Sequence, residues 1–276
     1  MQWERFFRHT FKRPTQRVSP GSSVFHYTNV NHPNNWGDII GLSICNHFSP
    51  RPLTEISDPY AAGKLLAVGS VMAFSMPGDT VWGAGTISPK ALGCGGRQMN
   101  ILSVRGPHTR EVLVRAGMTV PAVFGDPAML YPQIRPRSSG RETSHRWGVI
   151  PHYCDVGHSV LEKWADEGAL IIDICAGREE FISQLLSVDR IVSSSLHGLI
   201  MADAYEIPNA RITLNNKLYG GDFKFNDYGA SVSRGVIDST RVNPGESLKT
   251  LDTLPLNDTC HFNSDRLLSA APWNEF

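Results

Sequence analysis

The chain has 276 residues, of which 41% are hydrophobic and 19% charged, a composition typical of one large or two modest packed domains. Its 26 lysines and arginines balance its 26 aspartates and glutamates, which argues against a general nucleic-acid-binding protein. The five cysteines are scattered and form no C-x-x-C pair. We therefore expect reduced thiols in a cytoplasmic protein, and neither a disulfide framework nor a zinc site.

Residues 1–19 predict a basic, aromatic N-terminal arm. Trp3 and three phenylalanines alternate there with basic residues, and Glu4 is the one acidic residue in residues 1–20. Such a segment fits either a helix that lies on an anionic membrane surface or a flexible arm that packs on the domain. No apolar run is long enough for a transmembrane helix or for the core of a signal peptide, so any membrane contact is expected to be peripheral, at the inner face.

Residues 20–131 predict a first α/β domain. Pro107, at the first turn of an expected helix, and Gly117, just past its end, fit the usual asymmetry of helix termini. Periodic segments predict helices at 38–47 and 107–116. Short apolar runs predict buried strands at 65–68, 81–82, 101–104 and 122–124.

Residues 147–240 repeat this alternation of strands and helices. The segment 132–146 is rich in proline, arginine, serine and glycine and is the expected linker, while residues 241–276 are expected to form a tail. The fold class is therefore α/β, with two doubly wound, Rossmann-like domains, parallel sheets and a cleft between them. The second domain is expected to have strands at 148–151, 170–174, 190–193 and 210–214, and helices at 159–167, 178–187 and 197–205.

The turn at residues 193–198 is the most informative segment of the sequence. An apolar strand leads into three serines and then into His197, where a helix is expected to begin. Backbone N–H groups at such a helix start suit a phosphate or a carboxylate, and a histidine beside them can carry a proton near neutral pH. The alternative is a histidine satisfied within the core.

Two segments of the first domain offer polar or aromatic groups near strand ends. Asp38 opens an expected helix, so it is either an N-cap or an acceptor of a hydrogen bond from a substrate hydroxyl. Trp82 lies within the glycine-rich segment 78–85 and could stack on a sugar ring, although a buried tryptophan is the commoner case.

Arg105 closes an apolar strand just before a Gly-Pro helix start. An arginine in this position is poised to grip an anion with two N–H groups, or else to form a salt bridge with an acid such as Asp126. The segment 223–228 combines aromatic rings with amide and acid groups, a composition typical of sugar contacts, and a simple turn is equally consistent with it.

Several common catalytic motifs do not occur in the sequence. It contains no G-x-S-x-G elbow, no P-loop and no H-E-x-x-H motif. An Asp-x-Asp cluster that would point to a divalent metal does not occur either. We therefore expect no metal site.

Taken together and in order, six segments resemble the polysaccharide pyruvyltransferase family, in particular the bacterial exopolysaccharide ketal-pyruvate transferases. These segments extend from about residue 30 to residue 232. They are NWGD at 35–38, GDTVWGAG at 78–85, SVRGPHTREVL at 103–113, FGDPAML at 124–130, SSSLHGLIMADAYEIPN at 193–209 and KFNDYGAS at 224–231.

The resemblance implies a glycosyltransferase-B-like pair of Rossmann-type domains, phosphoenolpyruvate as donor, and no metal or other cofactor. It implies His197 and Asp38 as catalytic residues. The donor site would comprise Arg105, Ser194, Ser195, Leu196, His197 and Gly198. Some family members have arginine where this chain has Ser195, so the donor anion is expected to rely on backbone N–H groups or on another cation such as Lys217 or Lys224.

The expected reaction is transfer of pyruvate to a sugar of a surface-polysaccharide precursor, with formation of a cyclic ketal and release of phosphate. The acceptor is expected to be a lipid-linked oligosaccharide, contacted by Asn35, Trp82, Asp126, Asn226, Asp227 and Tyr228. The alternatives are a nucleotide-sugar-dependent glycosyltransferase and a non-catalytic carbohydrate-binding partner in polysaccharide assembly.

Overall fold

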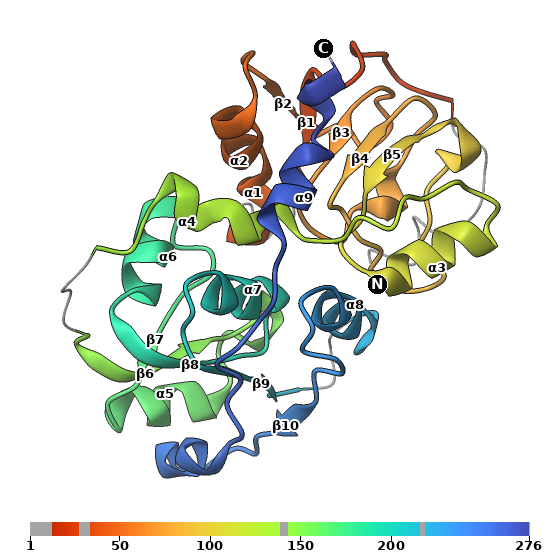
Figure 1. Cartoon of the computed structure of the whole chain (residues 1–276). Coiled ribbons are helices and arrows are strands. Elements are labelled where there is room, and N and C mark those ends of the chain that lie inside the picture. Colours follow the sequence, from red (N-terminus) through yellow and green to blue (C-terminus); the bar gives the residue numbers. More distant parts are fainter. Residues whose placement is uncertain (1–12, 28–33, 139–142, 216–218, 276) are drawn as a thin grey trace.

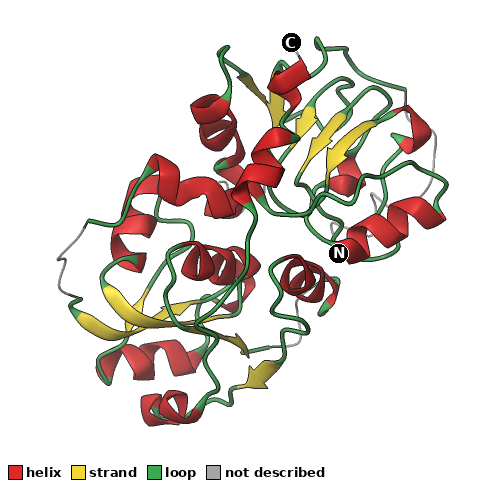
Figure 2. Cartoon of the chain, viewed as in Figure 1, coloured by secondary structure: helices red, strands yellow, loops and turns green. Residues whose placement is uncertain are grey.

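The computed structural model describes residues 13–27, 34–138, 143–215 and 219–275 (Figure 1). Within these residues the strands form two five-stranded sheets, and every strand pair is parallel. Helices cover the sheets, as the colouring by secondary structure shows (Figure 2). The predicted α/β class with two parallel, Rossmann-like sheets is confirmed.

The first sheet has the strand order β2-β1-β3-β4-β5. Its strands are short and, apart from the edge strand β2, mostly buried, as expected for a parallel sheet covered on both faces. The strands are β1 (Ser23–Phe25), β2 (Thr54–Ile56), β3 (Leu65–Leu66), β4 (Thr80–Trp82) and β5 (Asn100–Ser103).

The helices of this half include two that confirm the sequence pattern closely. The expected helix at 38–47 appears as two consecutive pieces, α1 (Trp36–Ile39) and α2 (Gly41–Phe48). Helix α3 (Pro107–Arg115) begins at its proline and ends before Gly117, whose φ is +83°. The remaining pieces are 3-10 turns η2 (Met72–Phe74), η3 (Gly96–Gln98) and η4 (Pro127–Leu130), and helix α4 (Tyr131–Ile134).

The second sheet has the order β10-β9-β8-β6-β7. Its strands are β6 (His145–Ile150), β7 (Leu170–Ile171), β8 (Val188–Ser193), β9 (Asn209–Thr213) and β10 (Ser239–Arg241). The expected helices are present as α5 (Ser159–Asp166), α6 (Arg178–Leu185) and α7 (Leu196–Ala204). Helix α8 (Phe223–Ser231) and the 3-10 turns η5 (Tyr153–Asp155) and η6 (Leu248–Thr253) complete this half.

Residues 254–275 return from the second sheet to the first. This segment carries α9 (Ser264–Ser269) and η7 (Pro272–Glu275), drawn in blue against the first half in Figure 1. The indole N–H of Trp82, on β4, donates to the carbonyl of Leu267 at 2.9 Å, and the rings of Trp82 and Trp273 meet edge to face at 5.0 Å. The core of the first half is therefore completed by residues that follow the second half in sequence.

Some sequence predictions of individual elements were wrong. The strand expected at 122–124 is reduced to one bridge between Val104 and Phe124, because Pro121 precedes the segment and Gly125 (φ +146°) ends it. The segment 223–228 lies in α8 and is not a turn. Strands β1, β2 and β10 were not predicted; β2 and β10 consist mostly of exposed polar residues and so have no apolar run.

The predicted membrane-binding arm lies mostly outside the described residues, as does Lys217. Within its described part, Val18 N–H donates to the carbonyl of Ala62, and Ala62 N–H donates to Gln16, so this stretch runs beside residues 60–62. None of the helices that the structure describes is long and apolar enough to cross a membrane.

Candidate functional site

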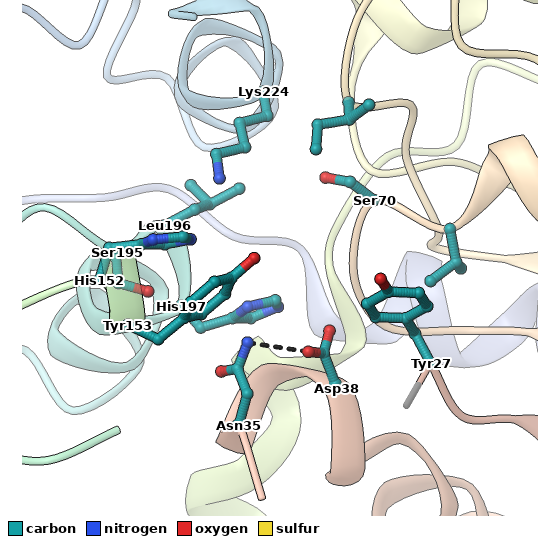
Figure 3. Close-up of a pocket in the computed structure, with 12 residues that line it drawn as sticks. Tyr27, Asn35, Asp38, Ser70, His152, Tyr153, Ser195, Leu196, His197 and Lys224 are labelled. Carbon is teal, nitrogen blue, oxygen red and sulfur yellow. Dashed lines mark hydrogen bonds between the residues drawn. The ribbon is translucent and has the colours of Figure 1, made fainter. Parts of the chain in front are cut away.

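A pocket opens where strand ends of the two sheets face each other. Each half contributes residues that follow the carboxyl ends of its strands, where parallel α/β sheets bind ligands. The lining residues are Tyr27, Asn35, Asp38, Ser70, Val71, Ile87, His152, Tyr153, Ser195, Leu196, His197 and Lys224 (Figure 3).

His197 reaches the pocket from the first turn of α7. Its side chain is 12% exposed, and Nε2 lies 3.8 Å from Oδ2 of Asp126, beyond hydrogen-bond distance. Burial, together with the positive charges of Lys224 and Arg105, lowers the pKa of His197 to about 3. The imidazole is therefore neutral at neutral pH.

Gly37 allows α1 to approach this imidazole. A Cβ atom at position 37 would overlap the His197 ring, so only glycine leaves room for the ring beside the α1 backbone. The glycine of the NWGD segment thus has a steric role. It brings a helix of the first half against the first turn of α7 in the second half.

The three serines of the turn, residues 193–195, have different surroundings. Ser193 Oγ donates to the carbonyl of Ile150, and Ser194 Oγ donates to Asp155 while accepting the N–H of His152. Ser195 and Leu196 line the pocket. The predicted donor residue Gly198 is buried against Ser193 Oγ.

The first turn of α7 offers backbone N–H donors. No side chain caps this helix, and the N–H groups of a first helical turn have no partner within the helix. The serine turn therefore presents the positive end of a helix dipole to the pocket.

Asp38 faces His197 across the pocket, and Asn35 Nδ2 donates to its Oδ2 at 2.8 Å (Figure 3). The N-cap position of α1 belongs to Asn35, so the interpretation of Asp38 as an N-cap was wrong. Burial raises the pKa of the Asp38 carboxyl to about 7, against the opposing effects of Asn35 and Lys224. Such a carboxyl can both accept and release a proton near neutral pH.

Arg105 is fully buried behind the pocket wall. Its Nε donates to Asp227 Oδ2 at 3.0 Å, Nη1 to Ser70 Oγ at 2.7 Å, and Nη2 to the carbonyl of Thr86 at 2.7 Å. Each guanidinium nitrogen thus has a protein partner. Ser70 lies between Arg105 and the pocket, where the structure places it among the lining residues.

Asp227 joins the two halves through α8. Besides the Nε–H of Arg105, it accepts the backbone N–H of Thr109 at 2.8 Å and the Thr109 hydroxyl at 2.7 Å. The salt bridge considered for Arg105 is therefore present, with Asp227 rather than Asp126 as the acid. The side chain of Asp227 extends from α8 to the first turn of α3, where it is buried. It does not line the pocket.

The other predicted acceptor residues lie outside the pocket lining, except Asn35. Trp82 has no exposed surface, Tyr228 donates to Asp203 Oδ2 at 2.8 Å, and Asn226 accepts the N–H of Ile237 at 3.0 Å. Asp126 is buried behind His197, and burial raises the pKa of its carboxyl to about 6. The acceptor contacts predicted for Trp82, Asp126, Asn226, Asp227 and Tyr228 are therefore not part of this pocket lining.

Lys224 projects from α8 toward the first turn of α7 (Figure 3). The residue is 8% exposed and forms no hydrogen bond or salt bridge with any residue that the structure describes. Burial first, and then the charge of Arg105, lower the pKa of its ammonium to about 8, while Asp38 opposes this change. At neutral pH the pocket thus contains a desolvated cation without a counterion.

Sequence reasoning missed several residues of the pocket wall. His152 and Tyr153 directly follow the predicted strand at 148–151, so the rule that ligands bind beyond strand ends could have identified them. Tyr27 follows β1, a strand that was not predicted. Among the described residues, no group of three or more histidine, cysteine, aspartate or glutamate side chains is arranged to hold a metal ion.

Comparison with known proteins finds similarity in the central part of the chain. Residues 97–216 match the family model described as polysaccharide pyruvyl transferase, a span that includes Arg105, Asp126 and His197. A relative named uncharacterized protein L143, from Acanthamoeba polyphaga mimivirus, is 30% identical over 167 residues, 58% of this chain and 57% of the relative. Another, succinoglycan biosynthesis protein ExoV from Rhizobium meliloti (strain 1021), is 26% identical over 133 residues, 48% of this chain and 40% of the relative.

The matched regions therefore span about half the length of these curated relatives. No solved structure matches the chain.

Proposed function

We propose, from the match of residues 97–216 to the polysaccharide pyruvyl transferase family model, that the protein transfers pyruvate from phosphoenolpyruvate to a sugar of a polysaccharide precursor. The name of the relative ExoV, a succinoglycan biosynthesis protein, supports an acceptor of this class. The product is a cyclic pyruvate ketal, and phosphate is released. The acceptor is a saccharide, for which a lipid-linked oligosaccharide is the form to test first.

The donor binds on the second-half side of the pocket. Phosphoenolpyruvate carries a phosphate and a carboxylate, so it needs a positive environment with several N–H donors. The first turn of α7 supplies N–H groups and the positive end of the helix dipole, and Lys224 adds a formal charge. Fixed N–H donors of this kind also stabilise the charge on departing phosphate.

The acceptor binds on the first-half side, near Asp38. With a pKa of about 7, its carboxylate can take the proton of a sugar hydroxyl as that hydroxyl attacks. Asn35 holds the carboxylate in place by its hydrogen bond to Oδ2.

His197 supplies the proton that activates the donor. The two anionic groups of bound phosphoenolpyruvate favour the imidazolium form, against the burial and the positive charges that keep His197 neutral in the empty pocket. The imidazolium protonates the methylene carbon of the donor, which leaves an oxocarbenium-like centre at the adjacent carbon. General acid catalysis of this type contributes roughly 10²–10⁴-fold to a rate.

The atoms balance over the whole reaction. One sugar hydroxyl forms the first C–O bond and loses its proton to Asp38, and a second hydroxyl of the same sugar forms the second bond as the C–O bond to phosphate breaks. The two hydroxyl protons replace the one given to the methylene carbon and the one taken by the released phosphate. Neither an oxidant nor a reductant is needed.

The observation that carries this proposal is the meeting of an uncapped helix start, an unpaired lysine, a histidine and a carboxyl of raised pKa in one pocket. The test is to incubate the protein with phosphoenolpyruvate and a panel of lipid-linked oligosaccharides, following phosphate release and acceptor mass. We expect phosphate release that depends on the acceptor, and a product heavier than the acceptor by about 70 Da, the mass that one ketal-linked pyruvate adds. Transfer of a hexose from a nucleotide sugar, with no phosphate released from phosphoenolpyruvate, would replace the proposal with a glycosyltransferase.

A further inference from the structure

We propose that Lys224 binds the anionic donor directly, and that Arg105 is a positioning residue that holds the Lys224 helix in place through Asp227. This inference rests on the proposed function for the identity of the donor. It assigns different tasks to two cations that lie near the same pocket.

Arg105 is not free to bind a ligand in this structure. It is fully buried, and its three guanidinium nitrogens donate to Asp227, Ser70 and Thr86. A donor anion would have to displace Ser70 from Nη1 or separate a buried ion pair. Separating such a pair leaves an uncompensated buried charge, which is strongly unfavourable.

Lys224 has the opposite properties. Its exposed fraction is 8%, and it lines the pocket. It forms no hydrogen bond or salt bridge within the described part of the chain. Its ammonium lies 5.3 Å from the centroid of the Phe225 ring, and beyond this contact a desolvated ammonium is unfavourable unless an anion joins it. The first turn of α7, which lines the same pocket through Leu196 and His197, offers N–H groups to that same anion.

The position of Lys224 depends on Asp227. The two residues are three positions apart in α8, and Asp227 fastens this helix to the first half by its bonds from Arg105 and Thr109. Helix α8 contacts α3 and lies below and to the left of it in Figure 1. Loss of the Arg105–Asp227 pair would therefore release the helix that carries the ligand-binding cation.

The test is donor binding by the full chain, measured by titration calorimetry with phosphoenolpyruvate and, separately, inorganic phosphate. We expect Lys224→Met to weaken both affinities by at least 10-fold, and Lys224→Arg to restore most of the loss because it keeps the charge. The matched control is Lys249→Met, an exposed lysine outside the pocket, which should bind as the unchanged protein does. Unchanged affinity in Lys224→Met would overturn the assignment.

A double-mutant cycle separates positioning from direct contact. If Arg105 acts through Lys224, Arg105→Met weakens binding alone but adds little in the Lys224→Met background. Losses that multiply would show that Arg105 contacts the donor itself and would overturn its positioning role. Asp227→Asn removes the negative charge of the Arg105–Asp227 pair with little change in shape, so it should reproduce the effect of Arg105→Met. It replaces Arg105→Met in the test if that variant does not fold.

Failure of the Lys224 assignment can be distinguished from failure of the proposed pyruvyl-transfer reaction. Lysine-dependent binding of phosphoenolpyruvate without transfer to any acceptor would contradict the proposed reaction and leave the Lys224 assignment standing. Transfer that proceeds with full donor affinity in Lys224→Met would do the reverse.

Discussion

Gly37 and His197 come from opposite halves of the chain, and the imidazole of His197 occupies the space that a Cβ atom of Gly37 would need. The α1 backbone thus forms one wall of the histidine site. Because α1 also carries Asp38, this contact sets the separation between the proposed acid and the proposed base.

Replacing Gly37 by alanine should therefore displace the His197 ring and lower the rate of pyruvyl transfer by about 10²-fold, the scale of a misplacement of about 1 Å. Gly41→Ala is the matched control, because a Cβ atom there meets nothing closer than 3.5 Å and alanine favours the helix. Phosphate release and melting temperature should be measured for both variants. An active Gly37→Ala enzyme would show that the ring position is not critical.

Donor binding should be accompanied by proton uptake at His197. The pKa of His197 is about 3 in the empty pocket, so at pH 7.5 the imidazole is neutral and becomes protonated only as the anionic donor raises its pKa. Calorimetric titration in buffers of different ionisation enthalpy measures this uptake.

His197→Asn should reduce the uptake by about half a proton or more. Comparison with this variant is needed because Lys224, with a pKa of about 8, also gains some proton when an anion binds. Equal uptake in the two proteins would assign the acid to another group, and Asp38→Asn would then be the variant to titrate next.

Asp38→Asn should separate activity from stability. Turnover should fall by about 10²–10⁴-fold, because the variant lacks the base. The free energy of unfolding of the variant should instead rise above that of the unchanged protein. The folded-state pKa of about 7 exceeds the ordinary value of 3.8, so the folded protein binds more protons than the unfolded chain between these values and loses stability as pH rises through that window.

At pH 8 we therefore expect Asp38→Asn to be more stable than the unchanged protein by about 1–3 kcal/mol, with the difference fading toward pH 4. Urea unfolding at the two pH values measures this difference. Asp238→Asn, at an exposed position, should show little change at either pH. A destabilised Asp38→Asn at pH 8 would contradict the assigned burial of the charge.

Leu267→Ala should lower the free energy of unfolding by about 2–5 kcal/mol, the usual effect of truncating a fully buried leucine. Leu267 is buried in the same cluster as Trp82, so tryptophan fluorescence should report the change. Val236→Ala, at a position 67% exposed, is the control for which little change is expected. An equally stable Leu267→Ala would show that α9 contributes little to the first half.

Local sequence patterns predicted the elements that are long or sharply bounded. The apolar run before Ser193 and the helix after Ser195 placed His197 at a helix start, because strand, turn and helix lie within one continuous segment. Pro107 and Gly117 likewise marked the limits of α3. Short polar strands such as β10 have no apolar run by which they could be recognised.

Partners distant in sequence could not be predicted. Arg105 and Asp227 are 122 residues apart, so the strand-end position of Arg105 indicated an anion site but not that a protein carboxylate already occupies it. The aromatic and amide residues at 223–228 lie on a helix with different surroundings along its length: Lys224 lines the pocket, and Tyr228, one turn later, donates to Asp203. Only the docking of α8 on α3 decides which side chain is accessible.

The hydrogen bond from Trp82 to Leu267 spans 185 residues of sequence and has a consequence for biosynthesis. While the first sheet emerges from the ribosome, the groups that cover its central tryptophan have not yet been made. The early intermediate would therefore expose an indole and the apolar surface around it until the second sheet has also been synthesised. We expect nascent chains halted near residue 145 to associate with chaperones, and release of the block to abolish that association once α9 has docked.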